Sequence, residues 1–258
     1  MKRFFVILLI IVASFPAVYA QTMPITISSR MQNVMFDGKW SFTQEWKESS
    51  LTEINGDSGP IYIRIAHWQN YVYVMIDVVG VSTFEKNSDR ATVCFDKNDA
   101  KSSIANYNDY CFVTVLDGKT FVLQGGSDTA LNGHFKNILP PLDFIGIGGI
   151  SDFNDRYTRI PHPTYEFKIP IELIGRSNHY GFYVSVYDAA KTKVYSWPEM
   201  KDTPPLTIPN PTMWGEMISP DSSLPEFPYP SLSLIISIIA IFYVTRFSKN
   251  QLRCNSSQ

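Results

Sequence analysis

The sequence predicts an all-β fold, an antiparallel β-sandwich of the jelly-roll or immunoglobulin-like kind. Short runs of alternating apolar and polar residues succeed one another along the chain, bounded by Gly, Asn, Asp and Pro, which is the pattern of strands joined by turns. Aromatic residues make up 14% of the chain, which suits strands half buried on a pleated surface. Only two short helices are expected, near residues 42–50 and 171–175.

The predicted strands begin with VMFDGKW. A hairpin follows, made of IYIRIA and YVYVMIDV joined across HWQN at residues 67–70. The remaining predicted strands are RATVCFD, DYCFVTVLDG, KTFVLQGG, DFIGIGGI, TYEFKIP, GFYVSVYD and KVYSWP. From Thr203 the chain becomes rich in proline, which cannot continue a central strand because it lacks the backbone N–H. We expect a closing edge segment through Trp214 and then an extended stalk.

The two ends of the chain predict export and anchoring. Residues 1–20 have a basic start, an apolar run and a small-residue cleavage site, as in a secretory signal peptide; an uncleaved N-terminal anchor is the alternative. A second apolar run at 231–247 reaches the length of a membrane span together with the flanking Phe227 and Tyr229. Arg246, Lys249 and Arg253 lie at its end and beyond it, which predicts a cytoplasmic tail at 248–258. The predicted order is therefore signal peptide, domain at 21–220, Pro-rich stalk at 221–230, transmembrane anchor and tail. This places the domain on the extracellular face of the cell membrane.

The charge distribution argues against a nucleic-acid partner. All 24 acidic residues lie between the two apolar segments, whereas five of the 22 basic residues lie within or beyond them. The exported part thus has 17 basic residues against 24 acidic ones, a net charge of about −7. Phosphate backbones are bound by clustered Lys and Arg, so such a surface is a poor match for them.

Cysteine usage fits an exported protein. Cys94 and Cys111 lie in neighbouring predicted strands, and outside the cell they can form a disulfide. Two buried free thiols are the alternative, because Cys94 shares a face with Thr92 whereas Cys111 shares one with Val113 and Val115. Cys254 lies beyond the predicted span, where it is expected to stay reduced or to carry a lipid.

Alternation in the hairpin gives each strand an aliphatic side and an aromatic side. Ile61, Ile63 and Ile65 share the core side, as do the valines of the second strand. Tyr62 and Arg64 point the other way, and continued parity places Trp68 with them. The strand GFYVSVYD likewise turns Tyr183, Ser185 and Tyr187 away from the core. Such a face of rings with polar tips suits the stacking of sugars, unless loops cover it.

Loop tryptophans on a rigid sandwich are further candidates for ligand contact. The expected sugar-binding residues are Tyr62, Arg64, Trp68, Tyr183, Trp197 and Trp214. Sealing the ends of the core is the alternative role for each tryptophan. Trp40 and Trp46 are instead expected to fill the core near the N-terminus.

Two Asp/Asn-rich segments predict candidate calcium sites. Asp96, Asn98 and Asp99 form the first, and Asp152, Asn154 and Asp155 the second. Ordinary turns without a metal have the same composition and are the alternative. Any bound calcium is expected to be structural. Catalytic motifs are missing from the sequence, with no GxSxG, HExxH or P-loop pattern, and an enzyme is not expected.

Several segments, in order, resemble the family 9 carbohydrate-binding module within the DOMON-like group of β-sandwiches. They are FDGKWSFTQEWKESS, IYIRIAHWQNYVYVMIDV, RATVCFDKND, TYEFKIPIELIG, GFYVSVYDA, YSWP and PTMWGEM. The resemblance implies a β-sandwich that binds glycans with aromatic side chains, often with structural calcium, and that assists polysaccharide breakdown without catalysis of its own. The HWQN turn departs from the His-Asp-Gly more common in the family, and no hydrolase domain is attached.

The resemblance leaves two other functions open. DOMON-like domains include haem-binding redox modules with Met and Lys or His as axial ligands, and Met31, Met35, Met75, Met200, Met213 and Met217 keep that alternative open. A structural protein of the cell envelope is the other. Finally, LPEFPYP before the second apolar run resembles the Pro-Glu-Phe sorting signal of archaeal surface proteins. The expected function is a surface-anchored, non-catalytic carbohydrate-binding module whose partners are a polysaccharide or glycan and the membrane.

Overall fold

The structure is a computed structural model that describes residues 22–129, 133–201, 203–205 and 207–218. All of these belong to one folded unit within residues 1–220. The predicted signal peptide, stalk, transmembrane anchor, sorting signal and tail lie outside the described residues. Within the described ranges, no helix is both long enough and apolar enough to cross a membrane.

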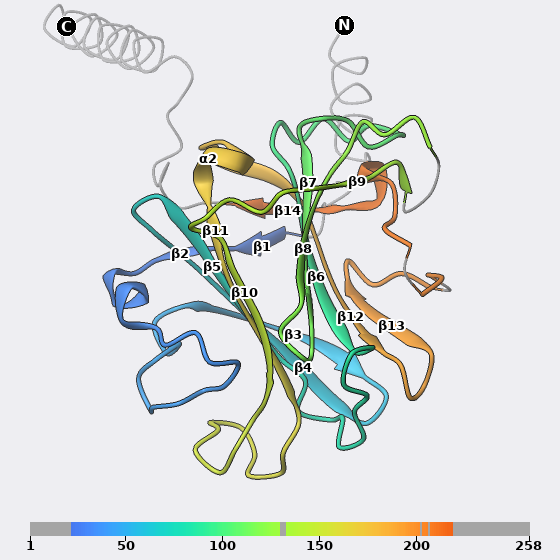
Figure 1. Ribbon diagram of the computed structural model, residues 1–258. Helices are drawn as coiled ribbons and strands as arrows, with labels where there is room; N and C mark the ends of the chain where they lie inside the picture. Colours follow the sequence, from blue (N-terminus) through green and yellow to red (C-terminus); the bar gives the residue numbers. More distant parts are fainter. Residues whose placement is uncertain (1–21, 130–132, 202, 206, 219–258) are drawn as a thin grey trace, which may run out of the picture. The chain divides into compact units, whose positions relative to one another are not determined.

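Two β-sheets face each other and form a sandwich, as the sequence predicts (Figure 1). The strand order of the first, called sheet A, is β1-β14-β12-β6-β7-β8-β9, with β13 also paired to β12. Its strands are β1 Thr22–Pro24, β6 Arg90–Asp96, β7 Asp109–Val115, β8 Thr120–Gln124, β9 Lys136–Ile138, β12 His179–Asp188, β13 Lys193–Trp197 and β14 Gly215–Ile218.

The second sheet, called sheet B, has the order β10-β11-β5-β4-β2, with β3 also paired to β4. Its strands are β2 Thr26–Ile27, β3 Ser50–Gly56, β4 Gly59–Trp68, β5 Tyr71–Asp77, β10 Ile145–Ile150 and β11 Pro163–Pro170. The helical elements are η1 Ser29–Asn33, α2 Ile171–Ile174 and η3 Pro211–Met213.

The sheets are mixed, which corrects the prediction of a wholly antiparallel sandwich. The first residues of the domain run from one sheet to the other, since β1 pairs in parallel with β14 of sheet A and β2 pairs in parallel with β4 of sheet B. Alternation of side chains does not depend on the direction of the neighbouring strand, so it could not show these two pairings.

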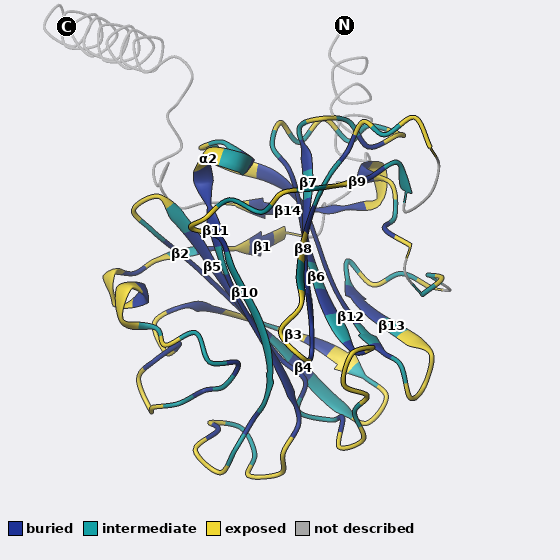
Figure 2. Ribbon diagram, in the orientation of Figure 1, coloured by how far each residue is buried: buried dark blue, intermediate teal, exposed yellow. Residues whose placement is uncertain are grey.

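The core between the sheets matches the predicted inward faces. Ile61, Ile63 and Ile65 of β4 and Val72, Val74 and Ile76 of β5 are all nearly inaccessible and belong to one cluster with the inner side chains of sheet A. Buried residues therefore run along the strands, while exposed residues concentrate in the connecting loops (Figure 2).

The hairpin prediction is also confirmed, with a tighter turn than HWQN. Trp68 pairs directly with Tyr71, so the turn consists of Gln69 and Asn70, and Gln69 has a φ of 53°. The short helix α2 lies where it was expected.

The N-terminal part of the domain differs from the prediction. Residues 34–40 form no strand and residues 42–49 form turns rather than a helix. This segment instead lies on the outer face of sheet B, where Trp40 and Trp46 are buried with Met31, Ala66, Tyr73 and Met75. We call this group the sheet B outer cluster. The N-terminal segment has apolar residues because they fill a second core outside the sandwich. Their spacing resembles that of a strand, which is why the sequence predicted one here.

Candidate functional site

A cavity of about 330 Å³ lies on the outer face of sheet A. Successive strands place side chains from alternate positions on this face, so cross-strand partners form rows. One row crosses four strands, with Ser185 paired to Thr92, Thr92 to Val113 and Val113 to Phe121. The lining is completed by Arg90, Leu123, Asn137, Tyr183, Tyr187, Val194, Thr207 and Ile208.

The electrostatics of the cavity depend on Arg90. Its guanidinium carbon lies 4.9 Å from the centre of the Tyr187 ring, and its Nη2 atom is buried without a hydrogen-bond partner. Partial burial lowers the pKa of Arg90, but guanidinium stays charged in proteins. Nη2 is itself inaccessible, so it is the half-buried Arg90 side chain as a whole that lines the cavity and gives it a positive charge.

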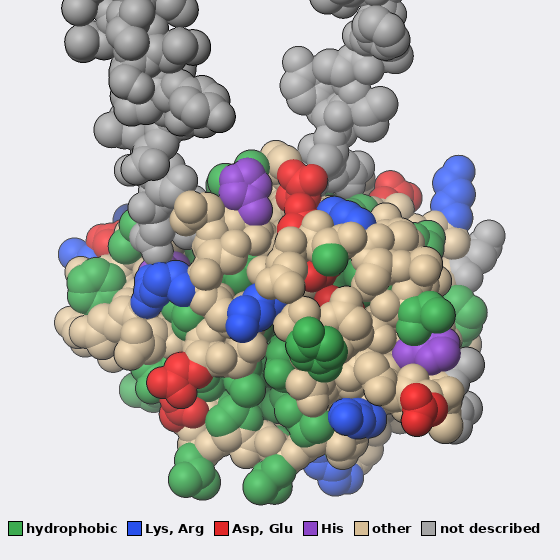
Figure 3. Space-filling view, turned by 90° about the horizontal axis from the view of Figure 1, so that it is seen from above, with side chains coloured by type: hydrophobic (Ala, Val, Ile, Leu, Met, Phe, Trp, Pro, Cys, Tyr) green, Lys and Arg blue, Asp and Glu red, His purple; other side chains and the backbone are tan. Residues whose placement is uncertain are grey.

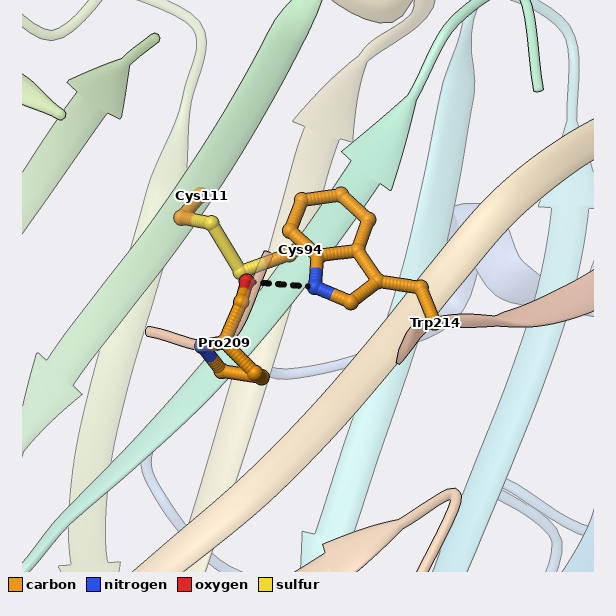
Figure 4. The surroundings of a disulfide bond; sticks show 4 residues. All are labelled: Cys94, Cys111, Pro209 and Trp214. Atoms are coloured by element: carbon orange, nitrogen blue, oxygen red, sulfur yellow. Dashed lines mark hydrogen bonds between the residues drawn. A yellow bond between two sulfur atoms is a disulfide. The ribbon is translucent and has the colours of Figure 1, made fainter. Parts of the chain in front are cut away.

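One wall of the cavity rests on the disulfide. Cys94 and Cys111 are direct cross-strand partners on β6 and β7, and the structure joins them in a disulfide, one of the two alternatives that the sequence left open. Trp214 lies beside them and donates a 2.9 Å hydrogen bond from Nε1 to the carbonyl of Pro209 (Figure 4). These contacts hold the segment that brings Ile208 to the cavity.

Trp214 itself is buried rather than available to a ligand. It is 4% exposed and stacks with Tyr183 at 6.3 Å and with Phe135 at 6.4 Å between ring centres. We therefore leave Trp214 out of the proposed site and assign it the role of supporting the wall. Tyr183 is 1% exposed, so although it lies in the cavity lining it offers little surface to a ligand.

The aromatic residues of the hairpin lie on the opposite side of the sandwich. The sequence pattern grouped the outer faces of β4 and β12, but β4 belongs to sheet B and β12 to sheet A. Tyr62, Arg64 and Trp68 do share one outer face, since Trp68 contacts the sheet B outer cluster. The structure therefore does not bring these three residues together with Tyr183.

Arg64 is 5% exposed and is fully engaged by the protein. Nε donates to the hydroxyl of Tyr157 at 2.8 Å, and Nη1 donates to the carbonyls of Trp46 and Ser49. Its guanidinium also lies over the ring of Trp40. We therefore infer that Arg64 attaches loops to sheet B and does not contact a ligand.

Tyr62 and Trp68 are both partly buried. The ring of Tyr62 stacks on that of Tyr157 at 3.9 Å, which occupies one of its faces. The indole Nε1 of Trp68 is buried without a hydrogen-bond partner. Neither residue lines the cavity on sheet A.

Trp197 lies at a second hollow, between β3 and β13. This hollow has a volume of about 780 Å³ and is lined by polar and charged residues together with Trp197 and Met200. The Trp197 ring packs against Phe182 at 6.0 Å, so part of it belongs to the central core. Three lysines line the hollow, of which Lys191 and Lys193 contact Ser58 and Asp57.

The first candidate calcium segment is held by contacts within the protein. The two carboxylate oxygens of Asp96 accept hydrogen bonds from the backbone N–H groups of Asn98 and Lys101. The carboxylate of Asp99 forms an ion pair of 2.9 Å with the ammonium of Lys101. Because Lys101 already supplies positive charge here, these residues fit a loop that is closed without a metal.

The methionines considered for haem are spread over the domain. Met31 and Met75 belong to the sheet B outer cluster, Met217 to the central core, and Met35 and Met213 are exposed. Met200 is the one of the six that lines either cavity, the hollow between β3 and β13. No specific observation thus favours the haem alternative.

On the end of the domain seen in Figure 3, the described charged side chains do not form a patch of one sign. There the described acidic and basic side chains are interspersed with apolar and neutral ones.

Comparisons with known proteins return carbohydrate-binding modules. No family model matches the chain, and no curated protein matches it in sequence. Among solved structures, it is similar to a family 9 carbohydrate-binding module from Caldicellulosiruptor kristjanssonii in complex with glucose. The identity is 12%, the TM-score 0.49, and the match covers 77% of this chain and 95% of that one.

Two further structures have TM-scores of 0.46. A family 9 module from the same organism, in complex with cellotriose, is 12% identical over 77% of this chain and 93% of its own. A candidate carbohydrate-binding protein from Bacteroides uniformis is 8% identical over 78% of this chain and 100% of its own. Family 9 is also the family that the sequence motifs resemble.

Arg90, Phe121 and Asn137 were not among the expected site residues. The alternation of RATVCFD places Arg90 and Thr92 on the face of Cys94, so this face was visible in the sequence. Which strands lie beside it was not, because Phe121 and Asn137 join the cavity only through the pairing of β7, β8 and β9.

Proposed function

We propose that this chain is a non-catalytic carbohydrate-binding protein, anchored at the cell surface, that holds a saccharide in the cavity over sheet A. The observation that carries the proposal is a cavity that combines the positive charge of Arg90 with the aromatic rings of Phe121 and Tyr187. Binding sites for small ligands combine apolar walls with a few directed polar groups, and this cavity has both.

The residues match the two surfaces of a sugar ring. A pyranose has apolar C–H faces and an edge of hydroxyl groups. Phe121 is 38% exposed and offers a ring to the apolar face. The ring of Tyr187 lies in the neighbouring row, paired with Arg90 on the strand next to β12. Arg90 donates to hydroxyl oxygens, and the side chains of Ser185, Thr92 and Asn137 donate and accept.

The anchoring and the accessory role follow from the sequence. The predicted signal peptide and the apolar run at 231–247 support display of the domain outside the membrane. A site without catalytic motifs suits a protein that captures a polysaccharide for separate enzymes to degrade.

The test is binding of a panel of mono- and oligosaccharides to the full-length chain in detergent. Titration calorimetry measures the affinity, and tryptophan fluorescence provides an independent signal because Trp214 stacks on Tyr183 in the cavity wall. We expect Arg90→Met and Phe121→Ala each to weaken binding at least tenfold.

Trp68→Phe is the matched control, since it changes an aromatic residue on the other side of the sandwich. We expect it to alter the affinity less than twofold. If no sugar binds the wild type at millimolar concentration, the proposed function is wrong. If Trp68→Phe weakens binding and Arg90→Met does not, the site belongs to the hairpin instead.

A further inference from the structure

A buried cluster of His162, Asp77 and Asp155 lies on the outer face of sheet B, away from the proposed saccharide cavity. Their side chains are at most 1% exposed. Asp77 lies at the end of β5, and His162 directly precedes β11, the strand paired with β5. Asp155 comes from the loop at 151–162 that closes over this face.

We propose that this cluster is a binding site for a divalent transition metal, with Zn²⁺ as the ion that its ligands fit best. The ligand atoms are Nε2 of His162 and one carboxylate oxygen each from Asp77 and Asp155, all within 4.8 Å of one another. In tetrahedral zinc sites the ligand atoms lie about 3.4 Å apart, given bonds of about 2.0–2.2 Å. Small side-chain shifts bring the three atoms to that spacing, since Asp155 Oδ2 is already 3.8 Å from Nε2.

The orientation of His162 is the one found in metal ligands. Its Nδ1 lies 2.7 Å from the carbonyl oxygen of Ile160 and 2.8 Å from the hydroxyl of Ser151. A carbonyl oxygen only accepts, so Nδ1 donates a proton to it, and Nε2 faces the two carboxylates, where it is hydrogen-bonded to Oδ1 of Asp77. A metal ion would take the place of the proton in that hydrogen bond. Metal-bound histidines commonly have their other nitrogen fixed by a backbone carbonyl in this way.

Two carboxylate oxygens of the cluster are buried without a hydrogen-bond partner. They are Oδ2 of Asp77 and Oδ2 of Asp155. The other oxygen of Asp155 accepts from the backbone N–H groups of Tyr157 and Thr158, which aims Oδ2 at Nε2. Buried carboxylate oxygens are normally satisfied, and a bound cation satisfies both of these at once.

The donor set favours zinc over calcium. Calcium takes six to eight oxygen ligands, whereas imidazole together with carboxylates suits zinc and its neighbours. The hydroxyl oxygen of Thr164 is also buried without a partner, on the residue that pairs with Asp77. It or a water is available as a fourth ligand. Such a site would lock the loop at 151–162 onto sheet B and so stabilise the fold.

The experiment measures metal binding to the full-length chain. The protein carries a tag without histidine and the substitution Cys254→Ser, so that neither the tag nor the third cysteine binds metal. After dialysis against a chelator, Zn²⁺ is added and binding is followed by calorimetry, by bound metal per chain and by the melting temperature. We expect one Zn²⁺ per chain and a melting temperature that rises with Zn²⁺.

Asp155→Asn is the informative variant, because Asn keeps the oxygen that accepts the two backbone N–H groups. We expect it to weaken Zn²⁺ binding at least tenfold. Asp152→Asn in the same loop is the control and should change the affinity less than threefold. Asp152 accepts from the backbone of Asn154 and contacts Lys39, outside the cluster.

Binding of Co²⁺ to the wild type provides a second test, which needs no substituted protein. In the wild type we expect visible absorption bands typical of a tetrahedral site with nitrogen and oxygen ligands, displaced by Zn²⁺. If neither Zn²⁺ retention nor Co²⁺ bands appear at millimolar metal, or if Asp155→Asn binds Zn²⁺ as the wild type does, the proposal is wrong. The cluster is then a buried ion pair of the protein alone.

Discussion

Glu166 on β11 accepts a 2.9 Å hydrogen bond from Nε1 of Trp46, although 120 residues separate them in the chain. Its other oxygen accepts from the backbone N–H groups of Gly38 and Asp37. A single buried carboxyl group thus attaches the N-terminal segment to the outer face of sheet B. It also explains why the segments FDGKWSFTQEW and TYEFKIP occur together, since their residues meet in space.

Replacing Glu166 with Leu should destabilise the domain by about 4 kcal/mol, because three N–H groups lose their acceptor in a buried site. Glu166→Gln should cost less, since an amide oxygen remains and burial raises the pKa of Glu166 to about 8, so that a neutral group is tolerated. Urea denaturation of the purified chain measures both. Glu53→Gln, an exposed change on β3, is the control, and equal stability of Glu166→Leu and wild type would contradict the assignment.

Gly38→Ala should destabilise the domain more than Gly118→Ala. Both glycines have positive φ, 76° and 88°, so both substitutions strain the backbone by about 1–2 kcal/mol. A Cβ at Gly38 would in addition lie 2.6 Å from the backbone nitrogen of Gly149, whereas one at Gly118 meets nothing within 4 Å. Thermal melts of the two variants measure the difference. Equal melting temperatures would show that the loop containing Gly38 is not closely packed against β10.

Asp109→Asn should remove part of the pH dependence of stability. Burial, together with the neighbouring carboxylate of Asp96, raises the pKa of Asp109 to about 7. The folded state therefore holds a proton that the unfolded state releases above about pH 4. Stability is lost as the pH rises from about 4 to about 7, by up to about 1.4 kcal/mol per pH unit, and is then constant.

Urea denaturation of wild type and Asp109→Asn at pH 5, 6, 7 and 8 tests this. Asn keeps an oxygen for the N–H of Asn106, which Asp109 accepts at 2.6 Å. The variant should gain stability relative to the wild type as the pH increases. A constant difference between the two proteins from pH 5 to pH 7 would show that Asp109 does not carry the proton.

Replacing both Cys94 and Cys111 with Ala should cost about 3 kcal/mol, the loss expected for opening a loop whose ends are 17 residues apart. Denaturation with and without reductant provides the control, since reductant should lower the midpoint of the wild type and leave the double variant unchanged. The fluorescence of Trp214 should also change, because the indole packs in the same cluster as the disulfide. A wild type insensitive to reductant when unfolded would indicate free thiols.

The sequence by itself determined the fold class, most strand positions and the inward faces, because each depends on local patterns. A period of two in IYIRIA or GFYVSVYD reports which side chains share a face wherever the strand is placed. Turn residues mark the ends of strands by their own backbone preferences, as at Gly118 between β7 and β8, which has a φ of 88°.

Tertiary structure alone decided which faces meet. β4 and β12 have similar aromatic patterns, yet they belong to different sheets of the sandwich. Arg64 on β4 is therefore buried and hydrogen-bonded to Tyr157, whereas Arg90, on the strand beside β12, lines the cavity. The cavity and the cluster at His162 each draw on residues that are distant in sequence and brought together by strand pairing. Pairing depends on the packing of the whole domain, and no local pattern specifies it.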